Sequence, residues 1–422
     1  MQKRKVISLF SNNKQLIGNF SYITLLEVFL LLAPLITYPY LVRVLGIDNY
    51  GLIITAQVLA SYASKIIDFG SNRVCAKHVS INRASKAKLS EIVSSVLVVR
   101  TVLWIICFAI YMTVVLAVPN YRSYIVLFLC SYFLTLNEVL FPQYFFQGME
   151  KMKYISIINI IVKLLFILLV FVLVKNERDM SIVPLMYAIG YALAGIFSMH
   201  IITSRMGLNL YIPSINEIRI YVKDSLPIFA TDMICTIKDK LSYFIIGAYC
   251  GMGEVVIYDL GLKINGLLIK PTQIVSTVLF PRFAKSRNTK QLKTITFWVF
   301  VFAVAMVALT NVFLPFIVKF FIDESIDLIP LRIFSLAPIV LSVSSFLSSN
   351  FFVAFGYNKY LLYSIIVTTI VYIVTLVIML ITHNLGTIYS FVILALISYL
   401  AELVYRLLMT SKILKQNYSH QI

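Results

Sequence analysis

Charged residues are scarce in this sequence. Asp, Glu, Lys and Arg make up only 13% of the 422 residues, whereas hydrophobic residues make up 60%. Soluble domains carry roughly a quarter charged residues, so a sizeable soluble domain is excluded. Apolar runs long enough to cross about 30 Å of hydrocarbon recur along the whole chain. The sequence therefore predicts an all-α integral membrane protein.

Cysteines are few and scattered, at Cys75, Cys107, Cys130, Cys235 and Cys250. They form no C-x-x-C motif and no cluster with histidine, which excludes a disulfide framework, a haem attachment site and a structural zinc site. No glycine-rich phosphate-binding loop is present, so nucleotide binding is not expected either. We therefore expect no cofactor and no metal, and no ATP hydrolysis by this chain.

Acidic residues are outnumbered two to one, with 18 Asp and Glu against 36 Lys and Arg. The basic start, MQKRKVISLFSNNKQ, has no small-residue cleavage site after it, so the first apolar run is expected to be a retained span. Twelve transmembrane helices are predicted, near residues 20–42, 49–70, 90–118, 123–145, 154–174, 181–203, 225–248, 254–279, 295–318, 329–354, 359–381 and 386–410.

Lysine and arginine are concentrated in the segments that lie inside if the amino terminus is inside. The densest run from Arg73 to Lys88 and from Arg282 to Lys293. This is the positive-inside pattern, and an even number of spans puts both termini in the cytoplasm. The excess of positive charge therefore indicates orientation and contact with anionic membrane lipids, and not a nucleic-acid partner.

Two short segments recur at nearly the same offset. Phe145 and Lys153–Tyr154 match Phe351 and Lys359–Tyr360, 206 residues later (351 − 145), and LGIDNYGLI resembles CGMGEVVIY at an offset of 205. Parallel repeats predict two six-helix lobes related by a pseudo-two-fold axis along the membrane normal, with a pathway between them. The expected lobes are residues 1–203 and 225–422, joined by a cytoplasmic linker at 204–224. The alternative is that apolar helices resemble one another by composition alone.

Ionisable residues occur within the predicted spans, where lipid-facing charge costs several kcal/mol. In the seventh span, Asp232 and Asp239 share one helical face with Tyr243, while Lys240 lies beside it. In the eighth, Asp259, Lys263 and Lys270 follow a similar stripe. The remaining residues of this kind are Glu27, Asp68, Arg100, Glu138 and Lys163.

Two interpretations of these charges remain open. They can be ion pairs that lock helices together, which suits Asp259–Lys263, or they can line a polar pathway. Lys163, Arg100 and Lys270 have no acidic residue within one turn in the sequence and would suit an anionic cargo. A lipid-linked phosphate or pyrophosphate sugar fits, and so does an acidic soluble solute. Glu402 and Arg406 are expected to snorkel at the inner end of the last span.

Several segments resemble a known family. PLITYPYLVRVLGIDNYGLI, FPQYFFQGMEKMKYI, YDLGLKI and FPRFAK are similar to motifs of bacterial polysaccharide exporters. These exporters form the O-antigen flippase (Wzx-like) branch of the MOP superfamily, which also contains the MATE transporters. Asp239–Lys240 matches the acid–base pair of the family's seventh span. One departure is Val256, which stands where the second repeat should carry a glycine opposite Gly51.

The resemblance implies two six-helix lobes around a cavity. It also implies movement of an undecaprenyl-pyrophosphate-linked oligosaccharide between the leaflets of the bacterial cytoplasmic (inner) membrane. A gradient of H⁺ or Na⁺ would drive it. Expected partners are this glycan, membrane lipids, the coupling ion and polysaccharide polymerase machinery.

We predict two sets of site residues. Those expected to contact the cargo are Lys163, Lys240, Lys270, Lys263, Arg100 and Arg43. Those expected to couple transport to the ion gradient or to gate the pathway are Asp239, Asp232, Asp259, Glu138, Glu27, Asp68, Pro34 and Pro39. The two prolines would bend the first helix, because each removes a backbone donor.

Three other functions are considered. A multidrug exporter of the same superfamily would favour an acidic pathway for cationic drugs. A lipid II flippase would share the lobes and the mechanism. A polysaccharide polymerase would need catalytic groups on a long external loop, and the external loops here are short, so no enzymatic activity is expected.

Overall fold

The computed structural model describes residues 22, 25–27, 29, 33–322 and 326–419, and all regular elements within them are helices. Contacts within the chain divide it into two compact units, Met1–Ile237 and Lys238–Ile422. Helix α11 begins in the first unit and ends in the second. The lobe boundaries expected from the sequence, 1–203 and 225–422, remain a prediction.

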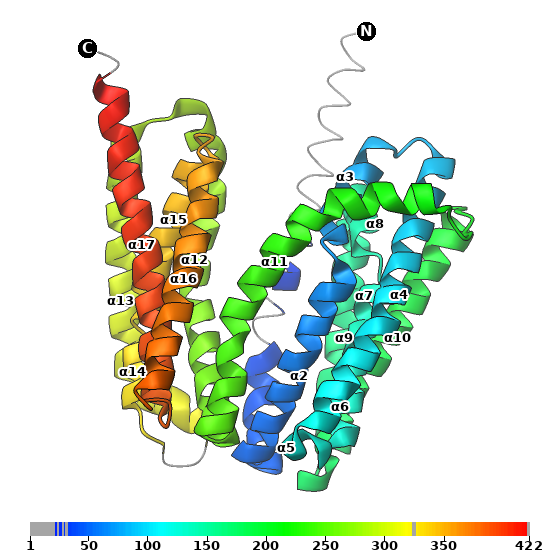
Figure 1. Cartoon of the computed structure of the whole chain (residues 1–422), viewed down its shortest axis with the longest axis horizontal. Helices are drawn as coiled ribbons and strands as arrows, with labels where there is room; N and C mark the ends of the chain where they lie inside the picture. Colours follow the sequence, from blue (N-terminus) through cyan, green and yellow to red (C-terminus); the bar gives the residue numbers. More distant parts are fainter. Residues whose placement is uncertain (1–21, 23–24, 28, 30–32, 323–325, 420–422) are drawn as a thin grey trace. The chain divides into compact units, whose positions relative to one another are not determined.

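The first unit opens with helical residues 33–45. It continues with α2 (Ile47–Asp68), α3 (Ser71–Ile81), α4 (Lys86–Ala117), α5 (Pro119–Arg122), α6 (Ile125–Tyr132), η1 (Phe133–Thr135), α7 (Leu136–Leu140), α8 (Gln143–Gly148), α9 (Met152–Leu173), η2 (Glu177–Ser181), α10 (Ile182–His200), η3 (Ile201–Arg205) and the start of α11 (Ile215–Tyr249). Its long helices lie side by side (Figure 1).

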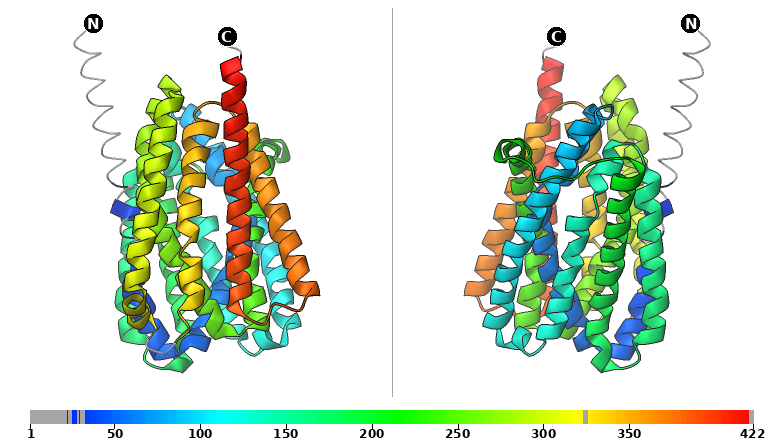
Figure 2. Two further views of the ribbon diagram at one scale, coloured as in Figure 1. Left: turned by 90° about the vertical axis from the view of Figure 1, so that its left-hand side faces the viewer. Right: turned by 90° about the vertical axis from the view of Figure 1, so that its right-hand side faces the viewer.

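The second unit holds the end of α11 and the remaining helices. These are α12 (Met252–Ser286), α13 (Thr289–Phe321), α14 (Ile329–Phe334), α15 (Ala337–Leu347), η4 (Ser348–Val353), α16 (Asn358–Ile381) and α17 (Ile388–Ser419). Within this unit too, the long helices run roughly along one direction (Figure 2).

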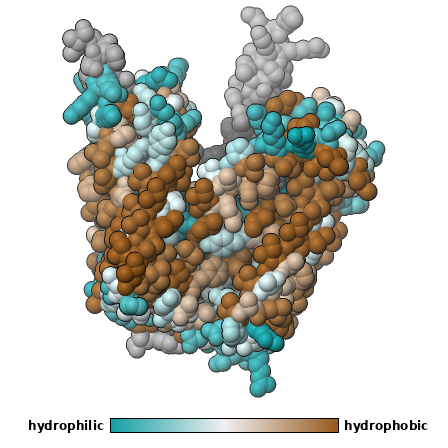
Figure 3. Space-filling model, viewed as in Figure 1, coloured by the Kyte–Doolittle hydropathy of each residue, from teal (hydrophilic) through white to brown (hydrophobic). Residues whose placement is uncertain are grey.

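Nine helical segments among the described residues are long and apolar enough to cross a membrane. Helices α11 and α12, each of 35 residues, lie outside this set and carry most of the predicted charged stripes. The first predicted span, 20–42, lies partly outside the described residues. The prediction of a helical multi-pass membrane protein is confirmed, whereas the count of twelve spans stays a prediction. Apolar side chains cover the flanks of each unit, and polar residues gather towards the ends (Figure 3).

The helices repeat with the offset that the sequence predicts. Met152 and Asn358, the first residues of α9 and α16, are 206 residues apart (358 − 152), and so are Ile182 and Ile388, the first residues of α10 and α17 (388 − 182). The matched phenylalanines Phe145–Phe146 and Phe351–Phe352 are fully buried, each pair in the core of its own unit. The internal repeat is therefore a property of the fold as well as of the composition.

Candidate functional site

The helix break between α2 and α3 brings charged side chains of the first unit together. Phe69 and Gly70 both have left-handed backbone conformations, with φ of 49° and 72°. The turn directs Asp68, the last residue of α2, and Ser71, the first of α3, towards Arg100 of α4. Glycine at position 70 also permits close packing, since a Cβ there would lie 3.0 Å from the backbone nitrogen of Phe229 in α11. Two helix ends therefore converge on one arginine.

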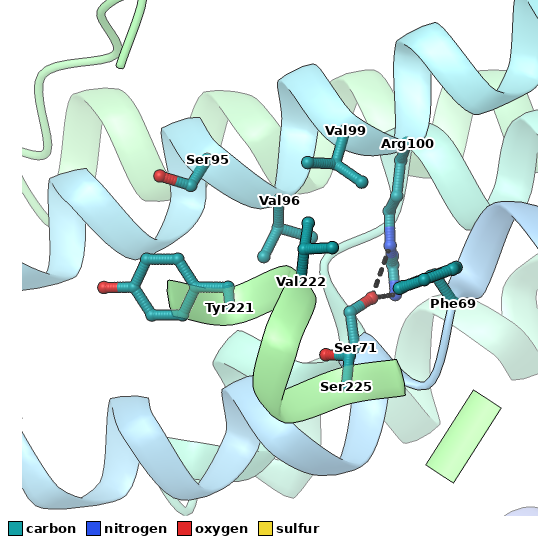
Figure 4. Close-up of a pocket in the computed structure, with 9 residues that line it drawn as sticks. All are labelled: Phe69, Ser71, Ser95, Val96, Val99, Arg100, Tyr221, Val222 and Ser225. Atoms are coloured by element: carbon teal, nitrogen blue, oxygen red, sulfur yellow. Dashed lines mark hydrogen bonds between the residues drawn. The ribbon is translucent and has the colours of Figure 1, made fainter. Parts of the chain in front are cut away.

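Arg100 is 1% exposed, and its guanidinium is held on three sides. Nη2 donates to Oδ1 of Asp68 at 2.6 Å, and both Nε and Nη2 donate to the hydroxyl of Ser71. Nη1 donates to the backbone carbonyl of Glu138. Figure 4 shows Arg100 with its two bonds to Ser71. Burying a charge is tolerated when it is paired and hydrogen-bonded in this way. Arg100 is thus positioned to join α2, α3, α4 and α7.

A narrow pocket lies beside this arginine, between α4 and the start of α11 (Figure 4). Val96, Val99 and Val222 make most of it apolar, and the hydroxyl of Ser95 has no hydrogen-bond partner among the described residues. The ring of Phe69 stacks on Phe229 of α11, with centroids 4.5 Å apart. The pocket is part of the packing between α11 and the α2–α3 break.

Two further predicted acids of α11 form ion pairs of different kinds. Asp232 lies 3.1 Å from Nη1 of Arg73 in α3, and the Arg73 side chain is 68% exposed. Asp239, in the second unit, contacts the ammonium of its neighbour Lys238 at 3.1 Å. Lys240 is half-buried beside them. Asp239 therefore pairs with its neighbour in the chain, Lys238.

The two predicted stripes of the second unit meet at Asp259. The hydroxyl of Tyr243, in α11, donates to Oδ1 of Asp259 at 2.9 Å. Lys263, one turn further along α12, binds the other carboxylate oxygen. Asp259 is buried, whereas the Lys263 side chain is 39% exposed. The pair predicted from its spacing does form, and its cationic member stays partly accessible.

Lys163 of α9 lies against an aromatic platform on α10. Its ammonium is 3.1 Å from the hydroxyl of Tyr187 and 4.4 Å from the centre of the same ring. The ring of Phe166, on α9, stacks on that of Tyr187, and the ring of Tyr191 lies 6.0 Å from Tyr187. A cation over an aromatic face gains about 0.5–2 kcal/mol, more when it is desolvated. The arrangement holds a half-buried positive charge at a fixed place.

The other predicted residues are dispersed. Lys270 is half-buried on α12 and directly precedes Pro271, inside the helix. Arg43 is exposed in helical residues 33–45, where Pro34 is half-buried and Pro39 is buried. Glu27 is exposed, and the side chain of Glu138 is half-buried. The predicted residues thus form separate groups within each unit: the Arg100 cluster, the Asp259 pair and Lys163 with its aromatic platform.

Sequence analysis missed a buried network at Glu402 and Arg406. The two side chains are 2.6 Å apart, and that of Arg406 is 7% exposed, so the expected snorkelling is wrong. Arg406 also donates to the carbonyl and hydroxyl of Ser344 and to Ser364. The i,i+4 spacing indicated the pair. Its burial depends on residues 42 and 62 positions away, which spacing does not reveal.

The comparisons with known proteins agree on family and fold. A family described as a polysaccharide biosynthesis protein matches residues 16–287. A curated protein of Shigella dysenteriae, provisionally described as an O-antigen transporter, is 26% identical over 339 residues, which cover 78% of this chain and 84% of the relative.

Two solved structures show the fold. A lipid II flippase, MurJ, in an inward closed conformation superposes with a TM-score of 0.69 at 15% identity, over 94% of this chain and 87% of its own. An outward-facing multidrug resistance MATE transporter of the MOP superfamily gives 0.59 at 16% identity, over 94% and 93%. The MATE-like fold class predicted from the sequence is confirmed.

Proposed function

Since the chain belongs to the polysaccharide biosynthesis protein family, we propose that it is a flippase for an oligosaccharide linked to undecaprenyl pyrophosphate. It would move this cargo from the inner to the outer leaflet of the bacterial cytoplasmic membrane by alternating access. The family match over residues 16–287 carries the proposal. The half-buried ammonium of Lys163 supports it, because the membrane-crossing cargo is an anion.

Lys163 and its platform would attract the pyrophosphate of the cargo in the first unit. An ammonium acts on phosphate as a point charge, and a low dielectric surrounding strengthens that attraction. Tyr187 holds the ammonium in place, so little side-chain order would have to be gained on binding. Lys240, Lys263 and Lys270 would supply the corresponding cations of the second unit, and Arg43 would contact the cargo near the first helix.

Arg100 would support transport structurally, without contacting the cargo. Its donors already bind Asp68, Ser71 and the Glu138 carbonyl, so we assign it to holding the α2–α3 break in shape. A break that is pinned to one arginine can move as a unit with the start of α11. The movement of this break would be the gating step that opens and closes the pathway. Further contributions to it would come from Pro34, Pro39, Glu27 and Glu138.

Asp259 is the best placed carboxylate for coupling. Its two oxygens bind Tyr243 and Lys263, and the Lys263 side chain is partly exposed. A pyrophosphate that binds Lys263 would compete with Asp259 for the ammonium. The released carboxylate could then take up a proton or Na⁺. Asp239 and Asp232 form partly exposed ion pairs, and a bound anion could break them in the same way.

We further propose that both termini are cytoplasmic, that polymerase machinery consumes the delivered glycan, and that the chain is not an enzyme. The alternatives are a multidrug exporter and a lipid II flippase of the same superfamily. Expression of the chain in a strain that lacks its O-antigen flippase separates them. Restored surface polysaccharide supports the proposal. Rescue of a strain depleted of its lipid II flippase, or uptake of cationic dyes by vesicles, would favour the alternatives.

A further inference from the structure

A long apolar hollow lies on the first unit between α9 and α10, which run side by side (Figure 1). Its volume is about 310 Å³, within the range of ligand pockets. Five of its side chains are between 38% and 60% exposed, so the hollow is open along its length. These are Ile157, Ile161, Leu165, Leu193 and Phe197.

Gly190 of α10 lets the two helices pack closely beside the hollow. A Cβ on Gly190 would lie 3.0 Å from Cγ1 of Val162 on α9. In the second unit, the residue at the same offset from the start of its helix is Leu396 (190 − 182 and 396 − 388 are both 8). The repeat therefore carries a large side chain where the first unit carries none.

One end of the hollow is positively charged. Lys153 lies there, exposed, and makes no ion pair with any residue that the structure describes. Beside it, the ring of Tyr154 stacks on Phe146, with centroids 5.2 Å apart, so the aromatic wall at this end is fixed by the core. The other lining residues are apolar. The hollow thus has the polarity of a lipid, with a site for an anionic head at one end and for a chain along the rest.

The length of the hollow fits one leaflet. From Lys153 to Leu165 the helix rises about 18 Å, at 1.5 Å per residue. This is roughly half of a hydrocarbon core of about 30 Å. The Lys153 end is the one that the positive-inside pattern places at the cytoplasmic surface. A lipid of the inner leaflet could therefore lay its chain in the hollow with its phosphate beside Lys153.

We propose that the α9–α10 hollow binds the polyprenyl chain of the cargo, with the adjoining phosphate at Lys153. This assignment rests on the proposed function. One hollow with one cation at its end suits a lipid that has one chain attached to one anionic head group, whereas a phospholipid brings two chains. Binding here would hold the cargo at the first unit before it crosses the membrane. It would be the loading step of the transport cycle.

The test is a binding measurement on the full-length protein in detergent, with undecaprenyl phosphate as the probe. Native mass spectrometry would count bound lipid against an equal concentration of phosphatidylglycerol. Gly190→Leu places a side chain between α9 and α10, at the position that Leu396 occupies in the second unit, and Leu193→Trp enlarges a side chain on the exposed rim of the hollow. We expect each to weaken binding by about 10-fold or more, equivalent to about 1.4 kcal/mol.

Charge is tested with a pair of matched variants. Lys153→Gln should weaken undecaprenyl phosphate binding several-fold, while Lys359→Gln, at the repeated position in the second unit, should leave it unchanged. Equal binding by wild type, Gly190→Leu and Leu193→Trp would overturn the proposal. Equal competition by phosphatidylglycerol would also overturn it, because the hollow would then be a general lipid site. If the wild-type chain restores surface polysaccharide but fails these binding tests, the hollow is wrong and the flippase function stands. If it binds but restores nothing, the function is wrong.

Discussion

The hydroxyl of Tyr243 donates a hydrogen bond to Oδ1 of Asp259 across 2.9 Å, and it joins α11 to α12 within the second unit. Lys263 occupies the remaining oxygen of the same carboxylate. A buried acid with two partners, one of them partly exposed, is a group that can exchange a partner when another anion arrives. This relationship supports the assignment of Asp259 to coupling.

Replacing Asp259 with Asn should uncouple transport from the ion gradient. The amide keeps the size of the side chain but cannot ionise, so it neither pairs with Lys263 nor takes up a cation. We expect the variant to move cargo at the same low rate with and without a gradient, in vesicles where the wild-type rate rises with the gradient. Asp327→Asn, in an exposed loop, is the control. Gradient-stimulated transport by Asp259→Asn would remove Asp259 from coupling.

Breaking the Arg100 cluster should destabilise the protein far more than breaking an exposed pair. Arg100→Met leaves Asp68 buried without its cation, and loss of one partner of a buried pair costs about 3–5 kcal/mol. Arg73→Met removes the 68% exposed partner of Asp232, and such pairs contribute about 0–1 kcal/mol. Thermal unfolding of the purified variants measures the difference. Equal melting temperatures for the two variants would show that Arg100 does not hold the α2–α3 break.

Two glycines with positive φ provide a test of the packing of α11. Gly356, just after η4, has a φ of 86° with open space around it, whereas Gly70 has a φ of 72°, and a Cβ added to it would lie 3.0 Å from the backbone of Phe229. An alanine at either position carries the strain of a positive φ, about 1–2 kcal/mol. Only Gly70→Ala must also displace α11. Its melting temperature should therefore fall well below that of Gly356→Ala, and the reverse order would contradict this packing.

How far the sequence predicts this arrangement depends on the range of each contact. Asp259 and Lys263 are one helical turn apart, so periodicity places them together and they do form a pair. Asp68 and Arg100 are 32 residues apart, and their contact depends on the turn at Phe69–Gly70. Helical periodicity in the sequence does not predict such a turn. Arg100 was therefore expected to contact the cargo, and its donors are found on protein groups.

The same limit applies to surfaces made by two helices. Nothing in the sequence distinguishes Ile161 and Leu193 from the other apolar residues of the predicted spans. The hollow between them depends on how α9 and α10 pack, with Gly190 close to Val162, and only the folded chain sets that packing. The repeat, by contrast, is visible in the sequence, because the matched Phe145 and Phe351 serve the same packing role in each unit.

Acidic pH should lower the stability of the start of α11. Glu217 accepts hydrogen bonds from the backbone and hydroxyl of Ser214, and these bonds lower the pKa of its carboxyl below the ordinary value. A lowered pKa in the folded state means that the stabilisation is complete above the ordinary pKa of about 4.3 and is lost as the pH falls through the lowered value. Glu217→Gln should lose this part of the acid dependence. We expect the melting temperatures of wild type and variant to converge as the pH falls below about 4. Parallel curves would contradict the capping role.

The most direct test of the central claim is cargo movement by the purified chain in liposomes. A fluorescent glycan on undecaprenyl pyrophosphate is placed in both leaflets, and a membrane-impermeant quencher reports which molecules cross under an imposed H⁺ or Na⁺ gradient. Lys163→Gln removes the charge on the aromatic platform, Lys163→Arg keeps it, and Lys175→Gln changes an exposed lysine as the control. Loss of a charged hydrogen bond costs about 1.5–3 kcal/mol, equivalent to roughly 10- to 100-fold in rate.

We predict that the wild-type chain and Lys175→Gln carry the labelled glycan across in response to one of the gradients. Lys163→Arg should retain part of that activity, and Lys163→Gln should fall by the stated factor at equal protein level. Failure of the wild-type chain to move the glycan under either gradient, while the same liposomes accumulate a cationic dye, would contradict the account.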